Sequence, residues 1–250
     1  MCRFVCYLGP PVTLGSVVLD PPYSLLRQAW APRFQRQGAI NADGFGVGWY
    51  DPARRAEPAR YRTARPLWSD RSFASLAGLV TAPALVAAVR DATPPAPVEE
   101  TGTQPFGAGP WLFAHNGKVD GWGIVPAVKT GLRRPLSEVR AAAIEGGADS
   151  EVLFALALDV VDSGRSPAEA LVAVIAAATA VAPSILNLIL TDGHRVAATA
   201  CGDSLFVLVA DDSVVVASEP YDEDPAWQRV PDGSVVEARP GWVSTTTLPS

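Results

Sequence analysis

Two cysteines stand at the start of the chain, which begins Met-Cys-Arg-Phe-Val-Cys. A cysteine in second position gains a free α-amine when Met1 is removed, so one residue then carries both a thiol nucleophile and a base. Alternatively, Cys2 and Cys6 are small apolar members of a first strand, because free cysteine behaves as a buried hydrophobic residue. Position alone favours this second interpretation, so other residues have to decide between the two.

The pair Asn116-Gly117 also has two interpretations. Asn-Gly is the commonest two-residue hairpin turn, which would give the pair a purely structural role. In the chemical interpretation, the Asn116 amide and the Gly117 backbone N–H bind one developing oxyanion. An acyl-transfer site needs such donors, and glycine allows the backbone to approach a ligand closely.

Three further polar residues could bind the head group of an amino acid. Arg90 ends the apolar run LVAAVR, where its guanidinium could bind a carboxylate through two hydrogen bonds or form a surface ion pair. Asp149 and Ser150 stand where a helix is expected to begin, and capping is the ordinary role of both residue types there. Asp149 could also bind an ammonium group and leave the capping to Ser150.

Histidine is scarce, since the chain contains only His115 and His194. This argues against a Ser-His-Asp triad and against a metal site rich in histidine, and we predict neither a metal nor a cofactor. A cysteine nucleophile would therefore take its base from elsewhere, and the N-terminal amine is the obvious source.

The elements that must position these residues are short strands at both ends of the chain and two helices between them. The stretch NADGFGVGW, which starts at Asn41, has glycines at alternate positions, which predicts that another part of the chain approaches its backbone closely. The Pro/Gly-rich segment 93–110 is expected to be a surface loop. Strands are expected over residues 2–9, 45–50, 85–90, 111–117, 184–191, 195–201, 204–210 and 213–219, and helices over 148–164 and 166–182. This order predicts an α+β fold in which helices cover two facing, mainly antiparallel sheets.

Composition narrows the class of protein. The 250 residues include 48% hydrophobic and 18% charged residues, with a net charge of −6, which argues against a nucleic-acid-binding protein. The longest apolar run, Ala170–Ala182, is too short to span a bilayer, and no secretory signal is visible. Three cysteines make a disulfide framework improbable, so we predict a cytoplasmic protein with no membrane partner.

Five segments together resemble the class II glutamine amidotransferases of the N-terminal nucleophile hydrolase superfamily. They are Cys2 behind Met1, Asn41–Trp49 (NADGFGVGW), Val89–Thr93 (VRDAT), His115–Gly117 (HNG) and Asp149–Glu151 (DSE). The resemblance implies a four-layer αββα sandwich and one catalytic domain over residues 2–250, with Met1 removed. Two departures are Ala88, where the family often has histidine, and the missing Arg-Gly-Gln-Asp segment.

The resemblance also implies roles for single residues. Cys2 would be the nucleophile, and Asn116 with Gly117 would hold the oxyanion. Arg90 would bind the α-carboxylate of a glutamyl group and Asp149 its ammonium. The substrate-binding residues that the resemblance implies are Arg90, Thr93, His115, Asp149 and Ser150.

A subgroup of that family is more similar still. The opening MCRFVCYLGPP, the NADGFGVGW stretch and VVVASEP at Val214–Pro220 resemble the amidohydrolases of ergothioneine biosynthesis, which release glutamate from γ-glutamyl-hercynylcysteine sulfoxide. This implies a small γ-glutamyl substrate and no obligate protein partner, and it leaves room for a homo-oligomer. Alternatives are a glutaminase subunit that supplies ammonia to a separate synthase, a hydrolase of other amides, and a protein whose Cys2 is only structural.

The proposed substrate carries a trimethylammonium group, which an aromatic face can bind by cation–π attraction. We therefore expect one or two of four tryptophans to face it, although packing is the commoner role of any one of them. The four are Trp30, Trp49, Trp111 and Trp122.

Overall fold

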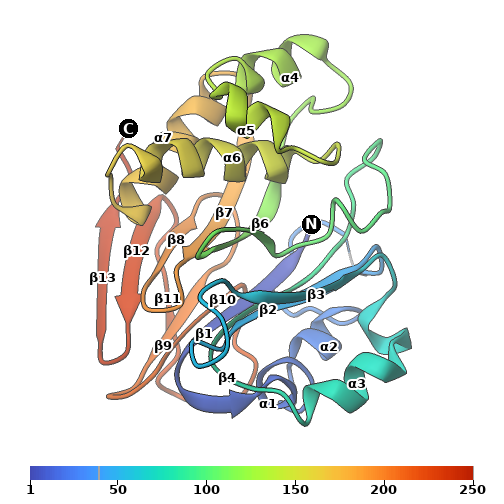
Figure 1. Ribbon diagram of the computed structural model, residues 1–250, viewed down its shortest axis with the longest axis vertical. Coiled ribbons are helices and arrows are strands. Elements are labelled where there is room, and N and C mark those ends of the chain that lie inside the picture. The colour runs from blue at the N-terminus through green and yellow to red at the C-terminus, as the bar shows by residue number, and fades with distance from the viewer. Residues whose placement is uncertain (39, 250) are drawn as a thin grey trace.

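The computed structural model describes residues 1–38 and 40–249 and consists of two antiparallel sheets between layers of helices (Figure 1). The seven-stranded sheet has the order β11-β9-β10-β1-β4-β2-β3, and the six-stranded sheet has the order β13-β12-β8-β7-β6-β5. The first sheet comprises β1 (Arg3–Thr13), β2 (Phe45–Tyr50), β3 (Ala59–Thr63), β4 (Thr81–Val89), β9 (Phe206–Val209), β10 (Val214–Ala217) and β11 (Gln228–Arg229). The second comprises β5 (Phe106–Ala108), β6 (Trp111–Val119), β7 (Ser184–Thr191), β8 (Val196–Ala200), β12 (Ser234–Arg239) and β13 (Trp242–Thr247).

Helices cover the outer face of each sheet (Figure 1). The seven-stranded sheet is covered by α1 (Leu14–Val18), α2 (Leu25–Gln28) and α3 (Arg71–Ala77), and a short 3₁₀ turn at Leu67–Ser69 precedes α3. The six-stranded sheet is covered by α6 (Asp149–Asp162) and α7 (Pro167–Thr179), with α4 (Pro126–Arg133) and α5 (Glu138–Ala142) beside them. The predicted four-layer αββα arrangement is therefore confirmed.

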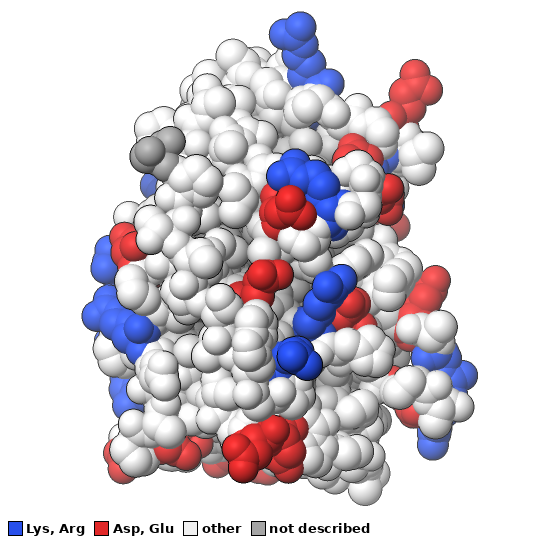
Figure 2. Space-filling model, turned by 90° about the vertical axis from the view of Figure 1, so that its left-hand side faces the viewer, with Lys and Arg blue, Asp and Glu red and all other residues white. Residues whose placement is uncertain are grey.

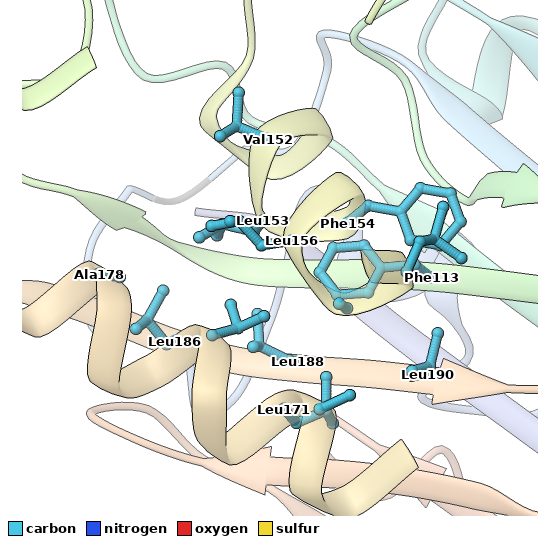
Figure 3. Close-up of a cluster of buried hydrophobic side chains, with 14 of the residues drawn as sticks. Phe113, Val152, Leu153, Phe154, Leu156, Leu171, Ala178, Leu186, Leu188 and Leu190 are labelled. Atoms are coloured by element: carbon cyan, nitrogen blue, oxygen red, sulfur yellow. The ribbon is translucent and has the colours of Figure 1, made fainter. Parts of the chain in front are cut away.

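Three apolar cores hold the four layers together, because each sheet buries both of its faces. One lies between the sheets and includes Phe4, Cys6 and Leu8 from alternate positions of β1. A second lies between the seven-stranded sheet and its helices. Figure 3 shows the third, in which Phe113 of β6 packs against Phe154 of α6.

The two long helices, α6 and α7, follow closely from the sequence. The Ser166 side chain accepts a hydrogen bond from the Glu169 backbone and the Glu169 carboxylate accepts one from Ser166, so the capping box that begins α7 is confirmed. Strands β2 and β7 have the predicted bounds, whereas β1 continues through Pro10 and Pro11 to Thr13, with a shift of register between Leu8 and Val12. The sequence reasoning did not anticipate β3, β5, β11, β12, β13 or the short helices α1 to α5.

The outer surface beside β12 and β13 carries scattered charges of both signs (Figure 2). Lys and Arg side chains lie beside Asp and Glu in the middle of this face, and most of the face is uncharged. Among the described residues, no helix has both the length and the apolar composition that crossing a bilayer requires.

Candidate active site

A cavity of about 400 Å³ lies where the end of β4, the end of β6 and the start of α6 come together. Figure 1 shows the N-terminus close to this region. Seven of the eight predicted site residues line the cavity, although they come from four distant parts of the sequence. They are Cys2, Arg90, Thr93, His115, Gly117, Asp149 and Ser150.

Cys2 lies at the edge of the space between the two sheets. Phe4 and Cys6 of β1 belong to the core in that space, whereas Cys2 precedes the strand and lines the cavity. Burial is the largest influence on its thiol and raises the pKa, while the N-terminal ammonium, the Asp91 backbone N–H and the Arg90 guanidinium act to lower it. A buried thiol of this kind needs a base close by before it can act as a nucleophile.

The presence or removal of Met1 decides whether the nitrogen of Cys2 can act as this base. The Met1 ammonium donates to the Asp91 carboxylate at 2.6 Å, and the Met1 side chain is buried. While Met1 is attached, the nitrogen of Cys2 belongs to a peptide bond and cannot accept a proton. The predicted removal of Met1 is therefore a chemical requirement of the N-terminal nucleophile mechanism, and it remains a prediction.

Asn116 and Gly117 do not form a hairpin turn, so the structural interpretation of this pair is wrong. Both lie inside β6, where they pair with Asn187 and Leu186 of β7. Gly117 has a φ of 153°, and a Cβ at this position would overlap the carbonyl oxygen of Ile185. Glycine is thus required at the point where this strand reaches the cavity.

The Asn116 side chain lies behind the cavity wall. Asn116 is fully buried and is not among the residues that line the cavity. Its Nδ2 donates to Oδ2 of Asp203 at 2.8 Å. Its Oδ1 is buried and has no hydrogen-bond partner among the described residues. The structure therefore brings Gly117 to the cavity surface and places the Asn116 amide next to it within the wall.

Arg90 is a buried cation without a carboxylate partner. Only 5% of it is exposed, and its guanidinium donates to the carbonyl oxygens of Pro97 at 3.0 Å and Asp43 at 3.4 Å. No carboxylate of the described residues lies within 4.0 Å of it, so the surface ion pair considered for it is wrong. A buried guanidinium without a counter-ion is costly, and a ligand carboxylate in the cavity would provide one.

Asp149 is the first residue of α6, and its carboxylate is held in place by backbone and side-chain donors. Oδ2 accepts from the Val119 N–H at 2.9 Å, and Oδ1 accepts from the Ser150 N–H at 2.7 Å. The N-cap residue is Ala148, so neither Asp149 nor Ser150 caps the helix from that position. The carboxylate is 16% exposed and faces the cavity, where a cation can reach it.

His115 and Ser150 lie next to this carboxylate, with the Ser150 hydroxyl between the His115 ring and Asp149. The His115 Nδ1 lies 3.0 Å from the Ser150 Oγ, and its Nε2 lies 3.0 Å from the Ile185 carbonyl oxygen. Since a carbonyl can only accept, Nε2 carries a proton, and in a neutral ring Nδ1 and the Asp149 carboxylate are then alternative acceptors for the single Ser150 hydroxyl proton. Ser150 Oγ also lies 3.2 Å from Asp149 Oδ1. Thr93 differs from these residues, because it is exposed at the rim of the cavity.

Glu151, the third residue of the DSE segment, fixes the turn that leads into α6. Its Oε1 accepts from the Gly146 N–H at 2.9 Å and from the Glu145 N–H at 3.3 Å. Burial raises the pKa of this carboxyl group, and these backbone donors act against the rise. Glu151 thereby positions the backbone that carries Asp149.

Gln104 is a site residue that the sequence reasoning missed. Its Nε2 donates to the His115 carbonyl at 2.9 Å and lies 3.8 Å from the Cys2 sulfur, while its Oε1 accepts from the His115 N–H at 2.5 Å. Thr103 and Gln104 are buried, so the expectation that segment 93–110 stays on the surface is wrong for its middle.

The alternating glycines of the NADGFGVGW stretch explain how this segment can lie there. A Cβ at Gly46 would overlap the Gln104 carbonyl oxygen, and a Cβ at Gly48 would come within 2.8 Å of the Leu112 side chain. The predicted close approach to β2 is confirmed. No motif in the sequence marked Gln104 itself.

Of the four tryptophans that were expected to face a trimethylammonium group, only Trp122 lines the cavity. Its Nε1 donates to the Gly147 carbonyl at 2.8 Å, and the Lys129 Nζ lies 5.8 Å from its ring centroid. The other three lie outside the cavity. Trp30 packs edge-on against Trp68 at the surface, while Trp49 and Trp111 pack against apolar cores outside the cavity.

Comparison with known proteins identifies the family. Residues 24–210 match the family model for class-II glutamine amidotransferases. The chain belongs to this family. Solved structures agree on the fold. A glutamine aminotransferase class-II domain protein from Silicibacter pomeroyi superposes with a TM-score of 0.72 at 24% identity, over all of both chains. Glutamine phosphoribosylpyrophosphate amidotransferase from B. subtilis gives a TM-score of 0.68 at 15% identity, over 99% of this chain and 49% of that one.

Curated relatives of this class II amidotransferase match it over almost the whole length. The chain is 41% identical to the γ-glutamyl-hercynylcysteine sulfoxide hydrolase of Mycolicibacterium smegmatis, covering 99% of this chain and 100% of that protein. It is 40% identical to the protein of the same name from Mycobacterium tuberculosis, over 99% and 97%. A probable glutamine amidotransferase of Saccharomyces cerevisiae, DUG3, is 29% identical over 65% of this chain and 46% of that protein.

Proposed function

We propose that the chain hydrolyses the γ-glutamyl amide of γ-glutamyl-hercynylcysteine sulfoxide, releasing glutamate and hercynylcysteine sulfoxide in ergothioneine biosynthesis. The observation that carries the proposal is the composition of one cavity, which combines a cysteine thiol, an unpaired buried guanidinium and a carboxylate. These are the groups that an α-amino acid with a reactive side-chain amide requires. The relatives that match over the full length supply the leaving group, since both are named for this substrate.

The glutamyl head group is bound by its two charges. Arg90 binds the α-carboxylate and Asp149 binds the α-ammonium, while Thr93 closes the rim over them. Ser150 acts on the substrate through Asp149, because its backbone N–H donates to that carboxylate, and His115 holds the Ser150 hydroxyl beside it. Two opposite charges at fixed positions select an amino acid and reject simple acyl conjugates.

Catalysis then uses Cys2 after the removal of Met1. Its α-amine, with an ordinary pKa of about 7.7–8.0, takes the thiol proton directly or through water. The thiolate attacks the γ-carbonyl carbon, and the resulting oxyanion is held by the Gly117 N–H and the Asn116 amide. The C–N bond breaks as the amine leaves with a proton, and water then hydrolyses the thioester to release glutamate. Loss of one oxyanion donor costs about 10²–10³ in turnover.

The leaving group occupies the outer part of the cavity. Trp122 lies there and offers an aromatic face to the trimethylammonium group. The loop 94–97, rich in proline, lines the same part of the cavity and supplies apolar contact without the cost of ordering a flexible segment. No obligate protein partner is part of this proposal, and a location in the cytoplasm remains a prediction.

The decisive experiment measures glutamate release from γ-glutamyl-hercynylcysteine sulfoxide and from free glutamine in parallel, with Cys2→Ala as the blank. We expect strong preference for the first substrate and no release by Cys2→Ala. Preference for glutamine would instead assign the chain to the enzymes that supply ammonia to a synthase. The intact mass of the active protein should lack Met1, and full activity of a protein that retains Met1 would contradict the mechanism.

A further inference from the structure

A fully buried ion pair lies directly behind the proposed oxyanion site. The side chains of Arg3 and Asp203 both have 0% exposure, and Nη2 of Arg3 donates to Oδ2 of Asp203 at 2.7 Å. The same oxygen accepts from Nδ2 of Asn116 at 2.8 Å. Asp203 follows β8 in the chain, whereas Arg3 belongs to β1 and Asn116 to β6. One carboxylate therefore connects β1 and β6 to the segment after β8 beneath the cavity.

Stability alone does not explain this pair. A buried ion pair is often no more stabilising than apolar residues of the same volume, because both charges must be removed from water. The pair therefore calls for a role, and Asn116 is the proposed site residue that it contacts.

A carboxylate determines how the neighbouring amide is oriented. It can only accept hydrogen bonds, so it faces the Nδ2 of Asn116 and repels the Oδ1. Asn116 Oδ1 has no partner among the described residues, so within that part of the chain Asp203 alone fixes the orientation of the amide. One N–H of the amide bonds to Asp203, and the second makes no hydrogen bond to the described residues. A hydrogen bond to a charged acceptor is about twice as strong as a neutral one, which suits it to this task.

Arg3 makes this arrangement compatible with catalysis. An unpaired carboxylate behind an oxyanion donor would oppose the negative charge that develops in front of it. The guanidinium of Arg3 neutralises Asp203 and is itself held by the Gln35 Oε1 at 3.1 Å and the Ser204 Oγ at 3.3 Å. Because Arg3 follows Cys2 directly, the same contacts also anchor the strand that carries the nucleophile.

We propose that Asp203, neutralised by Arg3, is a positioning residue that holds the Asn116 amide with an N–H toward the reacting carbonyl. The inference rests on the proposed function, in which Asn116 stabilises the oxyanion. Asp203 would thus help to stabilise the transition state without touching the substrate.

The test begins with Asp203→Asn, which keeps the shape but allows the neighbouring amide to turn. We expect kcat to fall by about 10², which is the order of the loss for a misplaced or missing oxyanion donor, with KM changed by less than about twofold. Alkylation of Cys2 by iodoacetamide should keep its rate, because this displacement at carbon forms no oxyanion. Asp70→Asn is the matched control, since the Asp70 carboxylate also accepts from a side chain and from a backbone N–H but lies outside the cavity.

A double-variant cycle identifies the route of the effect. If Asp203 acts through Asn116, then Asp203→Asn causes no further loss of kcat in an Asn116→Ala background. Equal losses in both backgrounds, or normal kcat in Asp203→Asn alone, would overturn the inference. If Asp203→Asn fails to fold, the pair Arg3→Gln with Asp203→Asn removes both charges together and avoids an uncompensated one. Failure of the proposed function gives a different result, because the unmodified protein would then release no Cys2-dependent glutamate from γ-glutamyl-hercynylcysteine sulfoxide or would prefer free glutamine.

Discussion

Arg90 offers the sharpest test of the glutamyl head-group assignment, because its donors can be counted. A guanidinium has five N–H groups, and in Arg90 the Pro97 and Asp43 carbonyls use two of them. Three remain, and two of these suffice for a carboxylate. Each charge-assisted hydrogen bond contributes about 1.5–3 kcal/mol. Because the cavity is open to water, we take the lower value, so Arg90→Gln should cost about 3 kcal/mol in kcat/KM, or about 10²-fold.

The assay compares two substrates that differ only in the α-carboxylate. The unmodified enzyme should prefer the γ-glutamyl amide over the γ-aminobutyryl amide, which lacks this group, by about 10² in kcat/KM. Arg90→Gln should lose this preference, since it removes the partner of the carboxylate. Arg90→Lys keeps the charge but not the planar fork, so it should recover part of the preference. If Arg90→Gln lowered kcat/KM equally for both substrates, Arg90 would not bind the α-carboxylate.

The same variants separate binding from nucleophile activation. The Arg90 guanidinium lowers the pKa of the Cys2 thiol against the effect of burial. Removing this charge should raise the thiol pKa, so the alkylation of Cys2 by iodoacetamide should require higher pH in Arg90→Gln and stay unchanged in Arg90→Lys. Arg62→Gln is the matched control, because Arg62 also donates to a carbonyl of the loop after β4 but does not line the cavity. A normal alkylation profile in Arg90→Gln would contradict the electrostatic reasoning.

Three further substitutions test other parts of the site. Gly117→Ala should lower kcat by about 10² or more and also lower Tm, because a Cβ would overlap the Ile185 carbonyl; normal kcat and Tm would contradict the need for glycine. Asp149→Asn should raise KM about tenfold or more for γ-glutamyl amides and should have little effect on an analogue without the α-ammonium, and equal effects on both would remove its role. Trp122→Leu should lower kcat/KM for the betaine substrate by about 2- to 30-fold, from the about 0.5–2 kcal/mol of a cation–π contact, and leave glutamine turnover unchanged. Trp30→Leu is its control, and equal effects of the two tryptophan variants would remove Trp122 from recognition.

Local patterns determined how well the sequence predicted each element. The two long helices followed from their caps and apolar composition, and β2 and β7 from short apolar runs. The Asn116-Gly117 pair shows the limit of such patterns, because its local preference for a turn is overridden by pairing with β7 along the whole of β6. The β12–β13 hairpin lacked the alternation that marks a half-buried strand, since most of β13 is exposed.

The residues that support the site were harder to predict than those that line it. Cys2, Arg90 and Asp149 were proposed because each has chemistry unusual for its position. Gln104 and Asp203 have no such mark, since their roles exist only through partners 11 and 87 residues away in the chain. A glutamine in a loop and an aspartate after a strand are ordinary surface residues until the fold buries them. Such long-range contacts depend on how the two sheets meet, which no local pattern encodes.

The first strand explains why one of two neighbouring thiols is suited to chemistry. Cys6 faces the space between the sheets, whereas Cys2 lies just before β1 and lines the cavity. Cys6 is surrounded by apolar side chains, and burial alone raises the pKa of its thiol. Cys2 lies two residues before Phe4, where this apolar space ends and the cavity begins. There the Arg90 guanidinium and the Asp91 N–H oppose the effect of burial. Two thiols four residues apart therefore have different electrostatic surroundings, because Cys2 lines the cavity and Cys6 does not.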